Sequence, residues 1–194
     1  MLSKNVRKMV GIAFMMAMVI VLQFLSGVIP AVGGFSISLV LIPIVLGGAL
    51  FGPGAGALLG ATFGVIVTIN CITGADPGGA MVFQANPILC VLVVMAKGTL
   101  AGWLAALAFK LLQNRNSYLA MLVAACVCPI VNSGTFIACM LLFFKDVLAV
   151  WAGGGEIIAY ILTGLIVANF LPELIINVVF SPAGNTIMKI VKRK

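Results

Sequence analysis

The chain has 194 residues, of which 63% are hydrophobic and 8% are charged, and its formal net charge is +7. A soluble domain carries about 25% charged residues, so this composition excludes a water-soluble globular fold and favours a chain surrounded by lipid. Because histidine is absent, His-based proton relays, His metal ligands and Ser/His catalysis are excluded as well. We expect no metal or cofactor. We also expect no nucleic-acid partner, because the basic residues cluster at the chain ends and in one short loop, a distribution that membrane topology explains.

The first apolar segment covers about residues 9–29. It follows Lys4, Arg7 and Lys8 and therefore looks superficially like a signal peptide. The segment is longer than the usual hydrophobic region of a signal peptide and lacks a clear A-x-A cleavage site. We predict that it is a retained first membrane span.

The rest of the chain contains five further apolar segments, without internal repeats or a boundary for a second domain. The predicted fold is therefore a single all-α membrane domain, residues 1–194, with six transmembrane helices. Crossing the hydrocarbon takes about 20 helical residues, so the second and third segments are marginal and are expected to tilt or to be partly covered by neighbours. The predicted spans are residues 9–29, 37–51, 54–71, 88–112, 118–144 and 157–180.

The distribution of charge predicts the orientation. Cytoplasmic loops carry an excess of Lys and Arg, and placing both termini in the cytoplasm puts nearly all basic residues outside the spans on that side. The outer loops then hold Lys145 together with Asp76, Asp146 and Glu156. This orientation also places the polar stretch of residues 70–87 outside, between the third and fourth spans.

Glycine recurs at every fourth position in the sequence GPGAGALLGATFG. A nucleotide-binding loop would need a preceding strand and an acidic residue further along, and neither is present. Glycines on one helix face instead let a second helix approach closely, and the same spacing occurs in the fourth span. The glycines concerned are Gly52, Gly56, Gly60 and Gly64, with Gly98 and Gly102 in the fourth span.

Two ionisable residues lie inside predicted spans, Lys97 in the fourth and Glu173 in the sixth. Charges are costly in lipid, and such residues by default face a cavity or a partner. Lys97 lies roughly 15 Å along its helix from the outer end, and Glu173 lies roughly 9 Å deeper. A structural ion pair between them is the alternative to a substrate role, and a direct pair would need helix tilt or a kink at Pro172.

Polar residues in the fifth and sixth spans extend this pattern. Asn169, Glu173 and Asn177 are spaced four residues apart and so share one helix face. With Asn132 and Lys97, they predict the floor of a polar pocket near mid-membrane or in the outer half. We predict substrate-binding roles for Lys97, Asn132, Asn169 and Glu173, although each asparagine taken singly fits a helix–helix hydrogen bond equally well.

The outer stretch reads NCITGADPGGAMVFQANP. Its last two residues, Asn86 and Pro87, predict an N-cap and the first position of the fourth helix. The glycine pair and Pro77 predict a loop with definite turns, which we interpret as a lid over the pocket; simple solvation is the alternative. The further substrate-binding candidates at the mouth are Asn70, Asp76, Gln84 and Asn86.

The segment FSISLVLIPIVLGGALFGPGAGALLGATFGVIV is similar to the corresponding segment of ECF (energy-coupling factor) transporter S components. The segments AFMMAMVIVLQ, NPILCVLVVMAKGTLAGWLAALAFKLL and LPELIINVVF fit the same family. The chain therefore resembles, over nearly its whole length, the small membrane subunit that captures a vitamin.

This resemblance implies a six-helix S-component bundle in a bacterial plasma membrane. It implies a water-soluble vitamin of the pantothenate, riboflavin or folate class as substrate, and a partner module of one transmembrane coupling protein and two ATPases. ATP hydrolysis would belong to the partners, so the chain is expected not to be an enzyme. The AxxxA motif that packs on the coupling protein maps onto Ala13 and Ala17. Relatives often have arginine where this chain has Lys97, and a basic residue there suits an anionic substrate such as pantothenate.

Two other functions fit parts of the pattern. An autonomous secondary transporter or channel would also be a multi-span protein, but this chain is small and lacks the two similar halves of many such folds. An intramembrane enzyme is disfavoured because the chain has neither histidine nor paired intramembrane aspartates.

Overall fold

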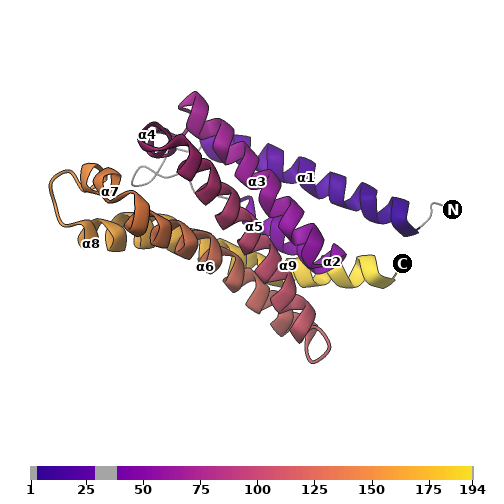
Figure 1. The fold of residues 1–194 in the computed structure, drawn as a ribbon. Helices are drawn as coiled ribbons and strands as arrows, with labels where there is room; N and C mark the ends of the chain where they lie inside the picture. Colours follow the sequence, from indigo (N-terminus) through magenta and orange to yellow (C-terminus); the bar gives the residue numbers. More distant parts are fainter. Residues whose placement is uncertain (1–3, 29–38, 194) are drawn as a thin grey trace.

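A computed structural model describes residues 4–28 and 39–193, and every regular element within these ranges is helical. Figure 1 shows the helices running roughly along one long axis, with α3 beside α1 and α6 beside α9. The elements are α1 (Lys4–Val28), α2 (Leu41–Phe51), α3 (Pro53–Thr73), α4 (Pro77–Ala85), α5 (Pro87–Leu112), α6 (Ser117–Phe143), α7 (Lys145–Trp151), α8 (Ile157–Tyr160), the π-helix η1 (Ile161–Phe170) and α9 (Leu171–Arg193).

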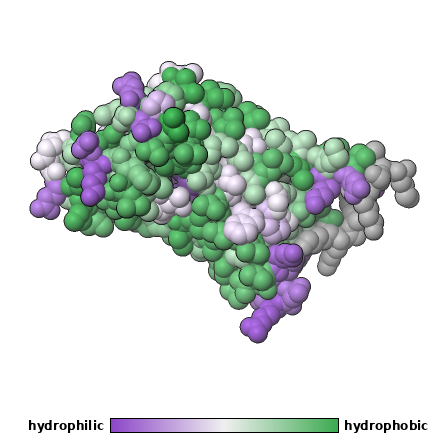
Figure 2. Space-filling model, viewed as in Figure 1, coloured by the Kyte–Doolittle hydropathy of each residue, from purple (hydrophilic) through white to green (hydrophobic). Residues whose placement is uncertain are grey.

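Five helical stretches of the described chain are long and apolar enough to cross a membrane. The surface agrees with this assignment, because apolar residues cover most of the face in Figure 2 and hydrophilic residues gather near the ends of the molecule. The chain is thus an all-helical protein with five candidate spans. These spans are Asn5–Ser26, Pro53–Thr73, Pro87–Leu112, Ser117–Phe143 and Ile157–Val191.

The second predicted span is shorter than expected. Residues 37–38 lie outside the described part, and the helix that follows, α2, has 11 residues, a length of roughly 16 Å. Most of its residues are buried, including Leu41, Ile44 and Ala49, because α2 contacts α1, α3, α5, α6 and α9. Because neighbouring helices cover α2, this apolar helix does not need the length of a helix that crosses the membrane in contact with lipid.

The glycines bring α3 and α5 into backbone contact, as predicted. Gly56 faces the carbonyl of Gly102, and Gly60 faces the carbonyl of Gly98, so a methyl group at any of these four positions would collide with backbone. The prediction was wrong for Gly52, which lies between α2 and α3 at φ 96° with open space around it. At that position the glycine provides a turn with positive φ rather than a close approach.

The polar stretch contains a helix that the sequence analysis treated as a loop. Asp76 caps α4, since its Oδ1 accepts a hydrogen bond from the backbone N–H of Gly79 at 3.2 Å, and Pro77 opens the helix. The predicted cap of the next helix is confirmed, because Asn86 Oδ1 accepts from Leu89 N–H at 3.1 Å and Pro87 begins α5. The turn predicted at Pro77 is the start of the short helix α4, whereas Pro87 begins the long helix α5 as predicted.

The last helix was predicted to stop near Phe180 and instead continues to Arg193 through Pro182. One proline removes a single N–H donor, and the helix is retained because α9 packs against α2 and α6. Its first part, η1, has π-helical hydrogen bonding and ends two residues before Pro172. Such wide turns occur frequently at functional sites.

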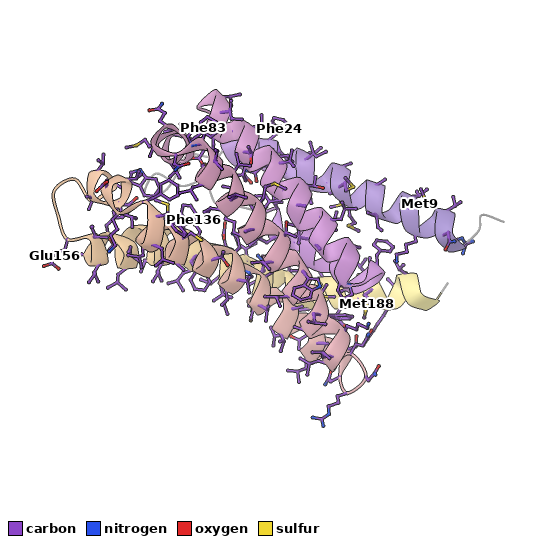
Figure 3. All side chains as sticks on the ribbon, in the orientation of Figure 1. Met9, Phe24, Phe83, Phe136, Glu156 and Met188 are labelled. Carbon is purple, nitrogen blue, oxygen red and sulfur yellow. The ribbon has the colours of Figure 1, made fainter. Side chains whose placement is uncertain are left out.

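The two chain ends lie at one end of the bundle, and α4, α7 and α8 lie at the other (Figure 1). Near the end that holds the termini, Ser117 Oγ is 2.7 Å from Asn185 Oδ1, and this contact joins the start of α6 to α9. Glu156 projects at the α4 and α7 end in Figure 3. The end of the bundle that carries α4 is also the end where the short helices α4 and α7 connect the long ones.

Candidate functional site

A polar cavity lies among the long helices beside α4. Its walls come from α1, α3, α4, α5, α6, η1 and α9, so seven elements contribute to one site. Its volume is about 90 Å³, several times the ~10–15 Å³ that holds one water molecule. The cavity is large enough to receive part of a small solute.

Lys97 extends from α5 into this cavity and lies between two aromatic rings. Its Nζ is 4.6 Å from the ring centroid of Phe136 on α6 and 5.9 Å from that of Phe63 on α3. A cation over an aromatic face is attracted by the negative charge of that face. The rings hold the ammonium group inside the cavity, away from lipid.

Two carboxyl groups line the same cavity. Glu173 is on the first turn of α9, just after Pro172, and is only 3% exposed, whereas Asp76 is half-buried at the start of α4. Both carry a charge opposite to that of the Lys97 ammonium group, which lines the same cavity. The site therefore holds charges of both signs, contributed by α5, α9 and the N-cap of α4.

Neutral polar side chains complete the lining. Asn132 and Ser133 come from α6, one turn after Pro129, and Gln23 comes from α1; all three are at most 7% exposed. Within the described residues, Gln23 Oε1, Asn132 Oδ1 and Ser133 Oγ have no hydrogen-bond partner. Buried polar atoms are nearly always hydrogen-bonded, so these oxygens mark a place where a solute can bind.

The structure brings together five of the eight predicted substrate-binding residues. Asp76, Lys97, Asn132, Asn169 and Glu173 all line the cavity, although they are as many as 97 positions apart in the sequence. This convergence results from packing of α5, α6 and η1–α9 around one space. Two of the three members of the predicted polar stripe, Asn169 and Glu173, thus line the same cavity as Lys97.

The other three candidates lie outside the cavity lining. Gln84 is exposed on α4, Asn86 uses its side chain to cap α5, and Asn70 lies near the end of α3, where its carbonyl accepts from Asp76 N–H at 3.3 Å. Asn177, the last member of the stripe, is buried and donates from Nδ2 to the Glu173 carbonyl at 2.8 Å. This hydrogen bond holds the Asn177 side chain against the backbone of Glu173.

Sequence reasoning missed several lining residues. Gln23 is a polar residue inside a predicted span, and the rule applied to Lys97 identifies it too. Phe63 and Phe136 carried no such signal, because phenylalanine is common in membrane helices. The thiols of Cys71 and Cys90 also line the cavity and are free.

Ala13 and Ala17 lie on the outward face of α1 and are exposed. Met9 and Phe24 mark the same helix in Figure 3 and are 69% and 64% exposed. The small-residue motif therefore faces away from the bundle and is available to lipid or to another protein.

Residues 7–183 match the family model described as ECF transporter, substrate-specific component. The chain belongs to this family. The match extends over the five candidate spans up to residue 183, and it confirms the resemblance inferred from the sequence. Among curated proteins none matches the chain. As an S component, the protein is the substrate-specific subunit of an ECF transporter and a multi-pass membrane protein.

Proposed function

We propose that this S component captures a water-soluble vitamin or related micronutrient, of the pantothenate, riboflavin or folate class, from outside a bacterial plasma membrane. It delivers the substrate inward together with a transmembrane coupling protein and two ATPases that hydrolyse ATP. The observation that carries the proposal is the cavity itself. Lys97, Asn132, Asn169 and Glu173 come from three separate stretches of chain and line one space within an otherwise apolar bundle.

The position of α4 supports entry from the outer side. Asp76, Gly79 and Val82 from the α4 segment form part of the cavity wall, and Val82 is 3% exposed. A short helix between two longer ones is a suitable lid, because within the described chain it contacts α3, α5 and α7 and lies apart from α6 and α9. In this proposal α4 covers the bound vitamin, and Asn70, Gln84 and Asn86 meet the substrate as it enters.

We further propose six membrane crossings with both termini in the cytoplasm. Both chain ends lie at the same end of the bundle (Figure 1), as an even number of crossings requires, and α2 would provide the core of the short crossing. Lys8 and Lys110 border one groove together with the turn between α2 and α3. Basic residues at that end agree with a cytoplasmic location.

For the coupling protein, we propose docking on α1 at Ala13 and Ala17. Small residues allow close approach of a partner helix, and both are exposed. Docking there leaves the cavity free to hold substrate, since the two alanines are not among its lining residues.

Purified full-length chain, titrated with water-soluble vitamins by calorimetry, tests the binding proposal. Binding of one vitamin is the expected result, and absence of binding at high micromolar concentration for all of them contradicts it. Proteoliposomes distinguish an S component from an autonomous transporter. We expect uptake only when the coupling protein, both ATPases and ATP are present; uptake by the chain alone, driven by an ion gradient, would favour the alternative.

A further inference from the structure

A large groove lies at the end of the bundle that holds the two termini. Its volume is about 690 Å³, and its walls come from α1, α2, α3, α5 and the turn between α2 and α3. This turn leaves the groove open, because a methyl group at Gly52 or Gly54 would meet no atom within 4 Å. The groove shares no lining residue with the polar cavity, so the two are separate features of the molecule.

The ends of three candidate membrane spans meet at this groove. Lys8 lies in the first turn of the span formed by α1, Pro53 is the first residue of the span formed by α3, and Lys110 lies in the last turn of the span formed by α5. A span ends where the hydrocarbon gives way to the lipid headgroups. The groove therefore lies at the headgroup level of one leaflet.

The groove carries positive charge that the chain itself does not balance. Lys8 and Lys110 are both exposed and line it, and no acidic side chain is among its described lining residues. Of the four acidic residues of the chain, three belong to α4, α7 and the start of α8 at the opposite end of the bundle, and one lines the polar cavity. The anion that neutralises the two ammonium groups therefore comes from outside the chain.

Apolar side chains continue the groove toward the membrane interior. Ile12 lies one turn beyond Lys8 on α1, and Leu58 lies five residues beyond Pro53 on α3, which is roughly 7 Å deeper; both line the groove. Leu58 is 47% exposed. A ligand that matches the groove has a negative group at the headgroup level and an apolar portion below it.

From this arrangement we infer that the groove is a binding site for an anionic phospholipid. The lipid phosphate binds at Lys8 and Lys110, and part of one acyl chain lies along Ile12 and Leu58. Basic pockets between membrane helices bind anionic headgroups in this way. The inference goes beyond the proposed function, because it assigns a ligand to a site that is separate from the substrate cavity.

The test titrates the purified full-length chain in non-ionic detergent with two lipids and counts bound lipid by native mass spectrometry. Phosphatidylglycerol and phosphatidylcholine with the same acyl chains differ in headgroup charge. We expect the anionic lipid to bind more tightly by roughly thirtyfold, about fivefold for each lysine. Glycerol 1-phosphate carries the phosphate without acyl chains and should not displace the lipid. Displacement at a similar concentration would indicate a site for free phosphate and overturn the lipid assignment.

Three substitutions in the groove locate the lipid. Lys8→Gln and Lys110→Gln should each reduce the preference for phosphatidylglycerol about fivefold, and the double variant should abolish it. Gly54→Leu keeps both lysines and fills open space at an exposed position, so it should weaken binding of both lipids.

Two further lysines provide matched controls. Lys189 is exposed on α9 outside the groove lining, and Lys145 is exposed on α7 at the other end of the bundle. Lys189→Gln and Lys145→Gln should leave the lipid preference unchanged. An equal loss in Lys189→Gln, or full lipid binding in Gly54→Leu, would show general attraction to a basic surface and overturn the inference.

The remaining outcomes separate this inference from the proposed function. Absence of a preference for phosphatidylglycerol, or a preference that survives the double lysine variant, overturns the inference and leaves the groove to a segment of a partner protein. Vitamin binding is measured on the same protein by calorimetry. Because the groove and the polar cavity have no lining residue in common, loss of the lipid site leaves vitamin affinity unchanged, and failure of one proposal does not imply failure of the other.

Discussion

The ammonium group of Lys97 lies 4.6 Å from the ring centroid of Phe136. This contact joins α5 to α6 and fixes the position of Lys97, the one basic residue among the described residues that line the cavity. Phe136→Leu removes the aromatic face while keeping an apolar side chain of similar size. We expect substrate affinity to fall about 2- to 30-fold, the range for a cation–π contact of roughly 0.5–2 kcal/mol. Phe143→Leu, at a 55% exposed position on the same helix, is the control, and equal effects of the two variants would show that Phe136 does not position Lys97.

Lys97 and Glu173 carry opposite charges and line the same cavity, so their contributions to stability should not add. Lys97→Met leaves a buried carboxyl, and Glu173→Gln leaves a buried ammonium. We expect the double variant to be more stable than the sum of the single losses predicts, by about 1 kcal/mol or more. Unfolding of all four proteins in detergent without substrate measures this coupling, and a coupling near zero would make the two residues independent.

The approach of α3 to α5 predicts a sharp difference between two glycines of one helix. In Gly60→Ala the new methyl group meets the Gly98 carbonyl, whereas in Gly54→Ala it meets nothing within 4 Å. The first change should destabilise the protein by about 1–3 kcal/mol, the usual cost of overpacking. The second should be neutral or slightly stabilising. Melting temperatures of the two variants give the comparison, and similar values would contradict the packing argument.

Gly79 lets α4 rest against α3. A Cβ at this position would lie 2.5 Å from Cys71 Sγ and 2.8 Å from Asp76 Oδ2, so Gly79→Val should lift α4 from the cavity. If α4 is a lid, substrate dissociation should accelerate several-fold, as stopped-flow exchange would record. Ala85→Val changes an exposed residue of the same helix and serves as control. Unaltered exchange in Gly79→Val would identify α4 as a connector only.

The exposed alanines of α1 allow binding and transport to be separated. Ala13→Trp and Ala17→Trp add bulk on the outward face without reaching the cavity. Substrate affinity should stay within about twofold of wild type, since surface changes rarely exceed ~0.5 kcal/mol, while ATP-driven uptake in the complete transporter should stop. Leu142→Trp on α6, a 72% exposed position, should preserve both activities. Loss of binding in the alanine variants would instead place them in the core.

The elements that sequence reasoning predicted well depend on local chemistry. The Asn86 cap, the Pro87 start and the close approach of a second helix at Gly60 follow from residue type and spacing. Lys97 and Glu173 stood out because charge is rare in an apolar chain.

The features that sequence reasoning missed depend on tertiary packing. The length of α2 reflects how much of it other helices enclose, and the passage of α9 through Pro182 reflects its contacts with α2 and α6. The role of Phe136 depends on its contact with Lys97, which lies on another helix. These contacts join residues that are far apart in the sequence, so no local sequence pattern predicts them.

The glycine contacts between α3 and α5 also limit how this protein can change shape. Where two backbones touch, neither helix can slide or rotate past the other without a collision, so α3 and α5 must move as one rigid body. Phe63, Cys71, Cys90 and Lys97 travel with that body, whereas Asn132, Asn169 and Glu173 belong to α6 and η1–α9. Any motion that changes the distance between these two groups of residues therefore has its hinge outside the α3–α5 contact.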